Sequence, residues 1–235
     1  MKIIFEDADL LAIDKPPGVS VHDAPGPGTS VLRMLREQHG LENLTPVHRL
    51  DKDASGVLLF AKSKQVASEI MKDWPSAEKT YLALCTGVPR KAKASIDAPI
   101  LENQTGKPER LKNALKWFQK NNPGVELPPL PPPKSSAVHP AGRTSRTEYE
   151  VVKRLKTISL LRVRPKQGRM HQIRVHLSHI GCPLLNDKLY GKPVKSSSLE
   201  RMPLHAAELT IVFRGRKRTF KAPLPIDIKK ALEAK

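Results

Sequence analysis

The chain has 235 residues, which suffice for one well-buried domain or for one domain with an elaborate insertion. Lys and Arg outnumber Asp and Glu by 41 to 23, and the net charge of +18 indicates a polyanionic partner unless it serves solubility alone. No apolar run approaches the roughly 18 residues that a membrane span needs, which excludes a transmembrane helix and favours a nucleic acid as the partner.

Two short strands and a helix are predicted in the first 40 residues. The strands lie at residues 3–5 and 10–13, and the sequence KPPG ends the second one, because proline cannot continue a β-ladder. The helix covers residues 29–40, with Thr29 or Ser30 as its N-cap and a glycine at its end.

The next predicted elements are a strand, a helix and a strand. Residues 57–61 are uniformly apolar and predict a buried strand. Residues 63–74 predict an amphipathic helix with Ser63 as its N-cap. Its apolar face consists of Val66, Ile70, Met71 and Trp74. Residues 79–88 alternate in polarity and predict a further strand.

The middle of the chain has a different composition. Residues 103–146 lose all periodicity, carry eight Lys or Arg against two Glu, and contain the proline cluster PGVELPPLPPPK. Such a segment favours extended polyproline II over a packed core. We interpret it as a basic insertion in the domain; a disordered linker between two domains fits the composition equally well.

Regular patterns return after the insertion. The predicted elements are a hairpin at residues 148–153 and 158–164, a helix at 170–181, and a strand pair at 205–213 and 216–225. Strands outnumber helices and often follow one another directly. We therefore predict an α+β fold with a central mixed, largely antiparallel β-sheet flanked by helices and loops.

One motif places two carboxylates beside basic side chains. The stretch HRLDKDASGVLLFAKS begins at His48 and Arg49 and contains Asp51 and Asp53. By itself the pair of aspartates is a weak indication of glycosidase-like chemistry. An Asp that caps the backbone of a turn is the commoner finding.

Cofactor-binding patterns are missing from the sequence. His171, His176 and His179 do not form the dense set of ligands that a tetrahedral zinc site needs, so we expect them to form hydrogen bonds or to face RNA. There is neither a GxxxxGK[ST] nor a GxGxxG motif, and we expect no cofactor and no metal. Arg169 and Arg174 fit a solvated helix face, a phosphate site or the partner of a buried carboxylate.

Three ordered motifs together resemble the RluA-type pseudouridine synthases. They are HRLDKDASGVLLFAKS, KTYLALCTG and GRMHQIRVHLSHIGCPLLNDKLYG, and the flanking segments DKPPGVSVH and LHAAELT also resemble the family. The resemblance covers most of the chain outside residues 103–146. It implies the pseudouridine synthase fold over a single catalytic domain, residues 1–235. The activity it implies is the cofactor-free isomerisation of uridine to pseudouridine in ribosomal or transfer RNA.

The resemblance also implies the catalytic residues. Asp51 matches the catalytic aspartate, which attacks C1′ of the sugar or helps to remove a sugar proton. Tyr81 matches the aromatic residue that lies against the target base. Arg174 matches an arginine, and we predict a salt bridge between Arg174 and Asp51, because a guanidinium keeps a buried carboxylate ionised. We assign Asp53 to the turn.

Contacts with RNA are predicted for a second set of residues. A base in folded RNA must be flipped out of its stack, and Arg49 resembles the residue that fills the vacated space. We expect Lys79, Arg169 and the basic insertion to hold phosphates. The remaining predicted RNA-binding residues are His48, His171 and Gln172.

Two departures from the family pattern and two rival functions remain open. Ala54 stands where a hydroxyl residue is commoner, and the basic insertion is not part of the common pattern. The rivals are a non-catalytic RNA-binding protein on the same scaffold and a nucleoside hydrolase that releases free base. We expect a monomer with no S4-type module. Cys85 and Cys182 form no CxxC pair and no signal peptide is evident, which indicates reduced thiols in the cytoplasm.

Overall fold

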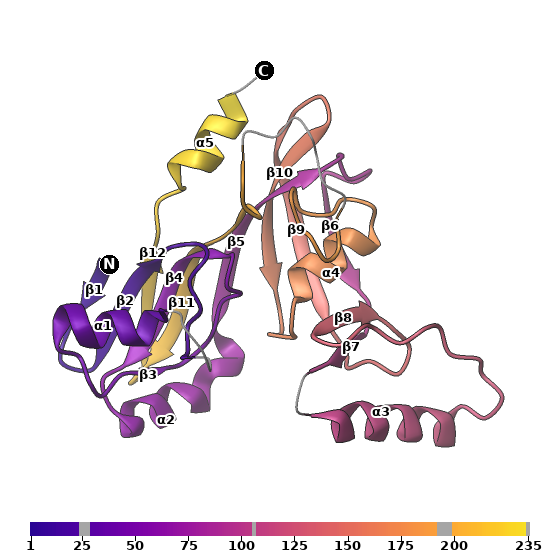
Figure 1. The fold of residues 1–235 in the computed structure, drawn as a ribbon, viewed down its shortest axis with the longest axis horizontal. Coiled ribbons are helices and arrows are strands. Elements are labelled where there is room, and N and C mark those ends of the chain that lie inside the picture. Colours follow the sequence, from indigo (N-terminus) through magenta and orange to yellow (C-terminus); the bar gives the residue numbers. More distant parts are fainter. Residues whose placement is uncertain (24–28, 105–106, 192–198, 234–235) are drawn as a thin grey trace. The chain divides into compact units, whose positions relative to one another are not determined.

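The computed structural model describes residues 1–23, 29–104, 107–191 and 199–233 (Figure 1). The chain forms two compact units. The first consists of Met1–Ala83 together with Ser196–Lys235, and the second of Leu84–Lys195. A single catalytic domain over the whole chain stays a prediction.

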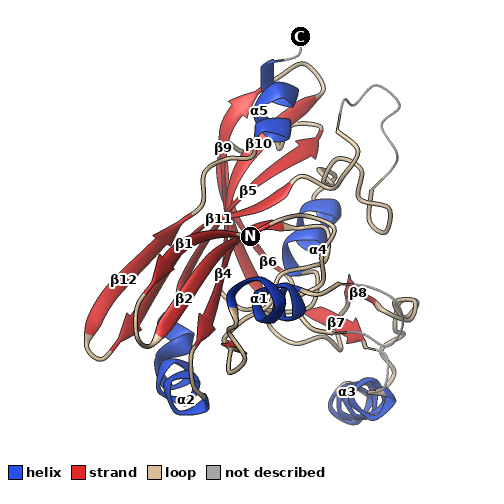
Figure 2. Ribbon diagram, turned by 60° about the vertical axis from the view of Figure 1, so that its left-hand side comes forward, coloured by secondary structure: helices blue, strands red, loops and turns tan. Residues whose placement is uncertain are grey.

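The first unit contains a largely antiparallel sheet (Figure 2). Its strands are β1 (Lys2–Glu6), β2 (Leu10–Lys15), β3 (Thr45–Pro46), β4 (Ser55–Ala61), β5 (Glu78–Thr86, of which residues 84–86 belong to the second unit), β11 (Leu204–Phe213) and β12 (Arg216–Lys221). The order is β1-β2-β4-β11-β5, with β12 on β11 and β3 on β4. Among the pairs described in this unit, β4 and β11 alone are parallel.

The helices of the first unit are α1 (Val31–His39), α2 (Lys64–Asp73), the 3₁₀ turn η1 (Trp74–Ser76) and α5 (Ile226–Glu233). Ser30 and Ser63 cap α1 and α2 as predicted, because each side chain accepts a hydrogen bond from the third residue that follows. The predicted apolar face of α2 is wrong at Met71, which is 48% exposed. Ala67 is buried there instead, beside Val66 and Ile70, as it also lies three residues before Ile70 on the helix.

The start of β4 is fixed by a close approach between two strands. All seven residues of β4 are buried, in agreement with the predicted buried strand. Gly56 has φ +107°, and a Cβ atom at this position would lie 2.2 Å from the carbonyl oxygen of Ala206 in β11. Only glycine allows this pairing, which sets the position of β4 immediately after the loop that carries Asp51.

The second unit also combines strands with helices. Its elements are the end of β5, β6 (Lys93–Asp97), β7 (Ile100–Asn103), α3 (Pro108–Asn121), β8 (Ser135–Val138), β9 (Arg146–Arg154), β10 (Ile158–Pro165) and α4 (Gln172–His179). β10, β9 and β6 form antiparallel pairs, and β7 and β8 form a separate two-stranded sheet. The predicted hairpin at β9 and β10 is confirmed. Cys85 and Cys182 are buried.

The prediction that residues 103–146 lack regular structure is wrong in part. Pro108 stands at the start of α3, where proline is well tolerated, and the helix continues for 14 residues. β8 pairs with β7 to close the segment. Residues 125–132, which contain most of the proline cluster, form neither helix nor strand. Phe118 is buried on α3, so the segment packs against the unit instead of leaving it.

The predicted fold class is confirmed. Helices accompany strands that are mostly antiparallel, and one parallel pair makes the sheet mixed. Within the described ranges, no helix is long and apolar enough to cross a membrane.

Candidate active site

Asp51 lies in the short loop between β3 and β4. Its two-residue turn, Lys52 and Asp53, is exposed and is closed by a hydrogen bond of 3.1 Å from the Ala54 N–H to the Asp51 carbonyl. Leu50 and Ala54 are buried on either side of the loop, and Asp51 itself is partly buried. The two buried neighbours hold Asp51 at the edge of the core, while Asp53 projects from the turn as predicted.

A buried lysine supports this loop from below. Lys15, the last residue of β2, is 0% exposed. Its Nζ donates hydrogen bonds to the carbonyl oxygens of Pro16 (2.8 Å), Lys52 (3.0 Å) and Ala54 (2.8 Å). The three donors of the ammonium group are therefore all used on backbone around Asp51. Burial lowers the pKa of Lys15 to about 8, although the charges of Asp53 and Asp51 act in the opposite direction.

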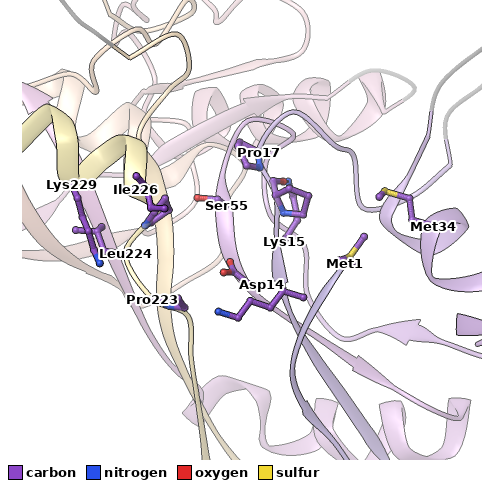
Figure 3. A pocket seen from close by; sticks show the side chains of 13 residues that line it. Met1, Asp14, Lys15, Pro17, Met34, Ser55, Pro223, Leu224, Ile226 and Lys229 are labelled. Carbon is purple, nitrogen blue, oxygen red and sulfur yellow. The ribbon is translucent and has the colours of Figure 1, made fainter. Parts of the chain in front are cut away.

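A cavity of about 470 Å³ lies beside Lys15 and holds none of the predicted site residues (Figure 3). Asp14 and Ser55 line it together with Met1, Met34 and the segment Pro223–Ile226. Burial raises the pKa of the Asp14 carboxyl, against the charges of His205 and Lys2.

Asp51 and Tyr81 are brought together in the first unit. Tyr81 lies on β5, opposite Ala206 of β11. Burial raises the pKa of the Tyr81 hydroxyl well above its ordinary value, and the negative charge of Asp51 raises it further. Gly56 of β4 and Tyr81 of β5 both pair with Ala206 of β11, so the strand that follows the Asp51 loop and the strand that carries Tyr81 flank the same residue. Tyr81 is a neutral phenol at neutral pH.

His48 has a structural position within the same loop. Its Nε2 accepts a hydrogen bond of 3.1 Å from the Leu59 N–H of β4, so the proton of the neutral ring is on Nδ1. The ring stacks on Trp74 with centroids 5.4 Å apart, and Lys79 Nζ lies 5.8 Å from the Trp74 centroid. Burial and the charge of Lys79 lower the pKa of His48 to about 3. His48 thus joins the loop to β4, while the neighbouring Arg49 is exposed.

In the second unit, Arg174 is held by a carboxylate that the sequence reasoning did not single out. Arg174 Nε and Nη2 donate to Asp187 Oδ2 and Oδ1 at 2.7 and 2.8 Å, and the side chains are 12% and 0% exposed. Burial alone would raise the pKa of Asp187. The Arg174 guanidinium and the N–H groups of Leu189 and Tyr190 outweigh burial and hold this pKa below its ordinary value. The pair is bidentate and charged.

Tyr190 connects Arg174 to the start of α4 and to β8. The Arg174 guanidinium lies 5.0 Å from the Tyr190 ring centroid. The Tyr190 hydroxyl accepts a hydrogen bond of 2.8 Å from the Ser136 N–H and lies 2.8 Å from His171 Nδ1. Asp187 and Tyr190 belong to the DKLYG sequence that carries part of the resemblance. Their place in that motif was the signal that could have marked them as site residues, although it does not name Arg174 as their partner.

The predicted RNA-binding residues before α4 differ in exposure. His171 has φ 57°, a left-handed conformation, at the N-cap position. Gln172 is buried, and its side-chain amide donates to the Arg146 carbonyl and to Thr147 Oγ1 at 3.0 and 3.1 Å. This burial argues against the predicted contact between Gln172 and RNA. Arg169 is partly buried and donates through Nη2 to the Thr144 carbonyl at 3.1 Å.

Of the remaining histidines of α4, His176 forms hydrogen bonds as expected, and His179 is exposed. His176 is buried between Thr147 Oγ1 and the Ala98 carbonyl, at 2.8 and 3.0 Å. In the described part of the chain, no three His, Cys, Asp or Glu residues are grouped to hold a metal ion. Asp51 and Tyr81 belong to the first unit and Arg174 to the second, and the predicted salt bridge between Asp51 and Arg174 stays a prediction.

Comparisons with known proteins identify the family and the fold of the chain. The model of the RNA pseudouridylate synthase family matches residues 9–179. The chain is 31% identical to ribosomal large subunit pseudouridine synthase C of Buchnera aphidicola over 98% of this chain and 69% of the relative. It is 31% identical to ribosomal large subunit pseudouridine synthase D of Haemophilus influenzae over 100% of this chain and 70% of the relative. The fold is similar to that of human RNA pseudouridylate synthase domain containing 4, with a TM-score of 0.74, 24% identity, and coverage of 99% and 92% of the two chains.

Proposed function

Because this chain belongs to the RNA pseudouridylate synthase family, we propose that it isomerises uridines of large-subunit ribosomal RNA to pseudouridine, with Asp51 as the catalytic carboxylate. The enzyme class is isomerase. Two relatives named for the large ribosomal subunit favour ribosomal over transfer RNA as the substrate. The observation that carries the assignment of the site is the electrostatic proximity of Asp51 to Tyr81.

The loop geometry supports a catalytic role for Asp51 over Asp53. Asp51 is partly buried beside Tyr81, whereas Asp53 is exposed in the turn. The Lys15 ammonium faces the carbonyls of Lys52 and Ala54, so it fixes the backbone on which the Asp51 carboxylate is mounted. We propose that Asp51 acts as the carboxylate that attacks C1′ or takes a sugar proton.

The environment of Tyr81 defines what its hydroxyl does. Since burial and the Asp51 charge keep the phenol protonated, the phenolate is not available as a strong base. We propose that the ring stacks on the uracil and that the neutral hydroxyl donates a hydrogen bond or relays a proton when C5 loses its hydrogen.

Arg174 is proposed as the partner of Asp51, and its geometry within the second unit constrains that pairing. The bonds to Asp187 use Nε and Nη2 on one edge of the guanidinium. In the proposed salt bridge with Asp51, Asp187 would set the plane of the guanidinium. In the same proposal Arg49, Lys79 and Arg169 contact the RNA, and Arg49 fills the space of the flipped base.

The test uses one incubation and two products. The protein is incubated with transcripts of large-subunit ribosomal RNA and with transfer RNA, without added metal or nucleotide, and the RNA is mapped for pseudouridine while the supernatant is assayed for uracil. Pseudouridine at defined sites in the ribosomal transcript, with none formed by Asp51→Asn, is expected. Free uracil would indicate the nucleoside hydrolase, and RNA binding without either product would indicate the non-catalytic protein.

A further inference from the structure

The insertion forms a groove whose lining fits a nucleotide. A cavity of about 350 Å³ lies between β7 and α3. Its lining consists of Ile100, Leu101, Glu102, Gln104, Arg110, Asn113, Ala114 and Arg143. Apolar side chains, amides and two guanidiniums in one concave site are the groups that hold a base, its edge and a phosphate. The volume lies at the lower end of small-molecule sites, as a single nucleotide requires.

We propose that this groove binds a nucleotide of the single-stranded substrate RNA other than the target uridine, and that the base next to it stacks on Trp117. The proposal rests on the proposed function, since it concerns how that enzyme holds its RNA. None of the residues Arg110, Asn113, Trp117 and Arg143 belongs to the three motifs that resemble the family.

The groove and Trp117 share one face of α3. Arg110, Asn113, Ala114 and Trp117 are spaced i, i+3, i+4 and i+7, which places them along one stripe of the helix. Trp117 is 66% exposed, while the next residue, Phe118, is buried and anchors the helix. A single exposed apolar residue is ordinary on a protein surface. Here it is the largest side-chain type and continues the line of a basic groove, which is the arrangement of a base-stacking platform.

The groove is electrostatically suited to a phosphate. Arg143 lines it, and the charge of Arg143 acts on Arg169, a residue of the GRMHQIR motif. Like charges in proximity repel, so an anion between or beside them would relieve that repulsion. Glu102 is the one carboxylate in the lining. Its Oε1 accepts from the Met170 N–H and its Oε2 from the Gln104 amide, so both oxygens have hydrogen-bond partners within the unit.

The same contacts connect the groove to α4. Glu102 bonds Met170, two residues before the helix that carries Arg174, and β8 bonds Tyr190 through Ser136 N–H. A nucleotide in the groove is thereby coupled to the segment that holds Arg174. Three further lysines of α3, Lys112, Lys116 and Lys120, are exposed on an adjacent face and raise the local concentration of RNA without shaping the groove.

The direct test observes Trp117 in the intact protein. The chain has two tryptophans, so labelling with 5-fluorotryptophan gives two ¹⁹F resonances, and Trp117→Phe assigns them. The probe is a 12-nucleotide single-stranded oligouridine RNA; heparin is the control polyanion. We expect the Trp117 resonance to shift with the oligonucleotide and to stay in place with heparin. An unchanged Trp117 resonance at saturating RNA, or an equal shift with heparin, would overturn the proposal.

The second test compares two double variants of equal charge. Arg110→Ala with Arg143→Ala removes the groove cations, and Lys112→Ala with Lys116→Ala removes two charges from the adjacent face of α3. For the oligouridine we expect roughly a tenfold loss of affinity in the groove variant, and a salt dependence shallower by about 1.4 in log–log slope. The lysine variant should lose less affinity. Equal losses would reduce the groove to unspecific charge and contradict the proposal.

The two proposals fail in different ways. Pseudouridine formed by the wild type, with the groove variant as active and as tightly bound as the wild type, would overturn the groove and leave the isomerase assignment in place. No pseudouridine from the wild type would overturn the isomerase assignment, whatever the ¹⁹F spectra show.

Discussion

Each unit of the molecule withdraws one cation from solvent, Lys15 in the first and Arg174 in the second, and the two are held in opposite ways. Lys15 in the first unit has no carboxylate in direct contact: its three hydrogen bonds go to backbone carbonyls. Arg174 in the second unit is bound edge-on by Asp187. The lysine therefore fixes a loop and acts on Asp51 through space, whereas the arginine is itself fixed and presents a defined plane. Lys15 fixes the backbone around it, whereas Arg174 is held in place by Asp187.

The two cations also differ in whether they can lose their proton near neutral pH. Burial lowers the pKa of Lys15 to about 8, close to the working range of a cell. A guanidinium keeps its proton at every pH that a folded protein meets. An arginine is therefore suited to pairing with a buried carboxylate, because its charge is permanent. A lysine is suited to bonding three carbonyl oxygens, because its ammonium group has three donors.

The largest expected effect tests whether Asp51, and not Asp53, is the catalytic carboxylate. Asp51→Asn keeps the size of the side chain and removes the charge, so pseudouridine formation should fall by about 10⁴-fold with little change in stability. Asp53→Ala, the matched control in the exposed turn, should retain measurable activity. Rates of pseudouridine formation under single-turnover conditions decide the matter, and equal losses in both variants would mean that the chemistry has been placed on the wrong residue.

The second effect tests Arg174, the cation that Asp187 holds in place. Arg174→Met leaves Asp187 buried without its partner and should reduce the free energy of unfolding by about 3–5 kcal/mol. Arg174→Lys keeps the charge and loses the planar fork, so on the order of 2 kcal/mol and most of the activity should be lost. Urea denaturation and turnover are measured together. Wild-type stability and turnover in Arg174→Lys would show that the fork is dispensable.

The third effect tests Lys15 through the pH dependence of the free energy of unfolding. In the unfolded chain Lys15 keeps its proton to its ordinary pKa of 10.5, and in the folded chain only to about 8. Between these values the unfolded state binds the additional proton, so Lys15 adds stability as the pH rises from 8 to 10.5, by up to about 3 kcal/mol. Below pH 8 the full cost of burying the charge is present.

The measurement is the free energy of unfolding at pH 7, 8, 9 and 10 for the wild type and for Lys15→Met. The methionine variant should lack the gain above pH 8. Lys52→Met, at the exposed neighbouring position, should follow the wild type. Parallel pH profiles of the wild type and Lys15→Met would contradict the assignment of the titration to Lys15.

The smallest effect concerns Tyr190, whose ring lies beside the Arg174 guanidinium. Tyr190→Phe keeps the ring beside Arg174 and removes the hydroxyl that accepts from Ser136 N–H. A loss of about 1 kcal/mol in stability and near-normal turnover are expected. Tyr190→Leu also removes the ring and should lower turnover further. Thermal denaturation of the two variants separates ring from hydroxyl, and a greater loss in Phe than in Leu would reverse this division.

Local signals made much of the fold predictable. Ser30 and Ser63 were predicted as N-caps because a serine hydroxyl before an amphipathic segment commonly accepts a hydrogen bond from the first turn of a helix. The structure confirms both caps. The hairpin of β9 and β10 and the strand pair of β11 and β12 are also confirmed. Helix α3 was missed although Leu111, Leu115 and Phe118 are spaced i, i+4 and i+7, because the lysines and prolines of residues 103–146 dominate the composition around it.

The candidate site was predictable to the extent that the family motifs name single residues. Asp51, Tyr81 and Arg174 come from those motifs, and the proximity of Asp51 to Tyr81 agrees with them. The partners of these residues were not predictable. Lys15 is hidden because its bonds go to backbone, which has no sequence signature. Asp187 lies 13 residues after Arg174, a separation that pairs them only once the chain after α4 has turned back.

The contact at Gly56 has a consequence for variation in this protein. A methyl group there has no room beside the Ala206 carbonyl, and the loop that carries Asp51 lies immediately upstream of β4. An alanine scan would thus find this glycine among the most damaging positions, although it has no side chain, touches no substrate and carries no charge. Sensitivity to substitution at such a residue reports how closely two strands pair, because any side chain there would push β4 away from β11.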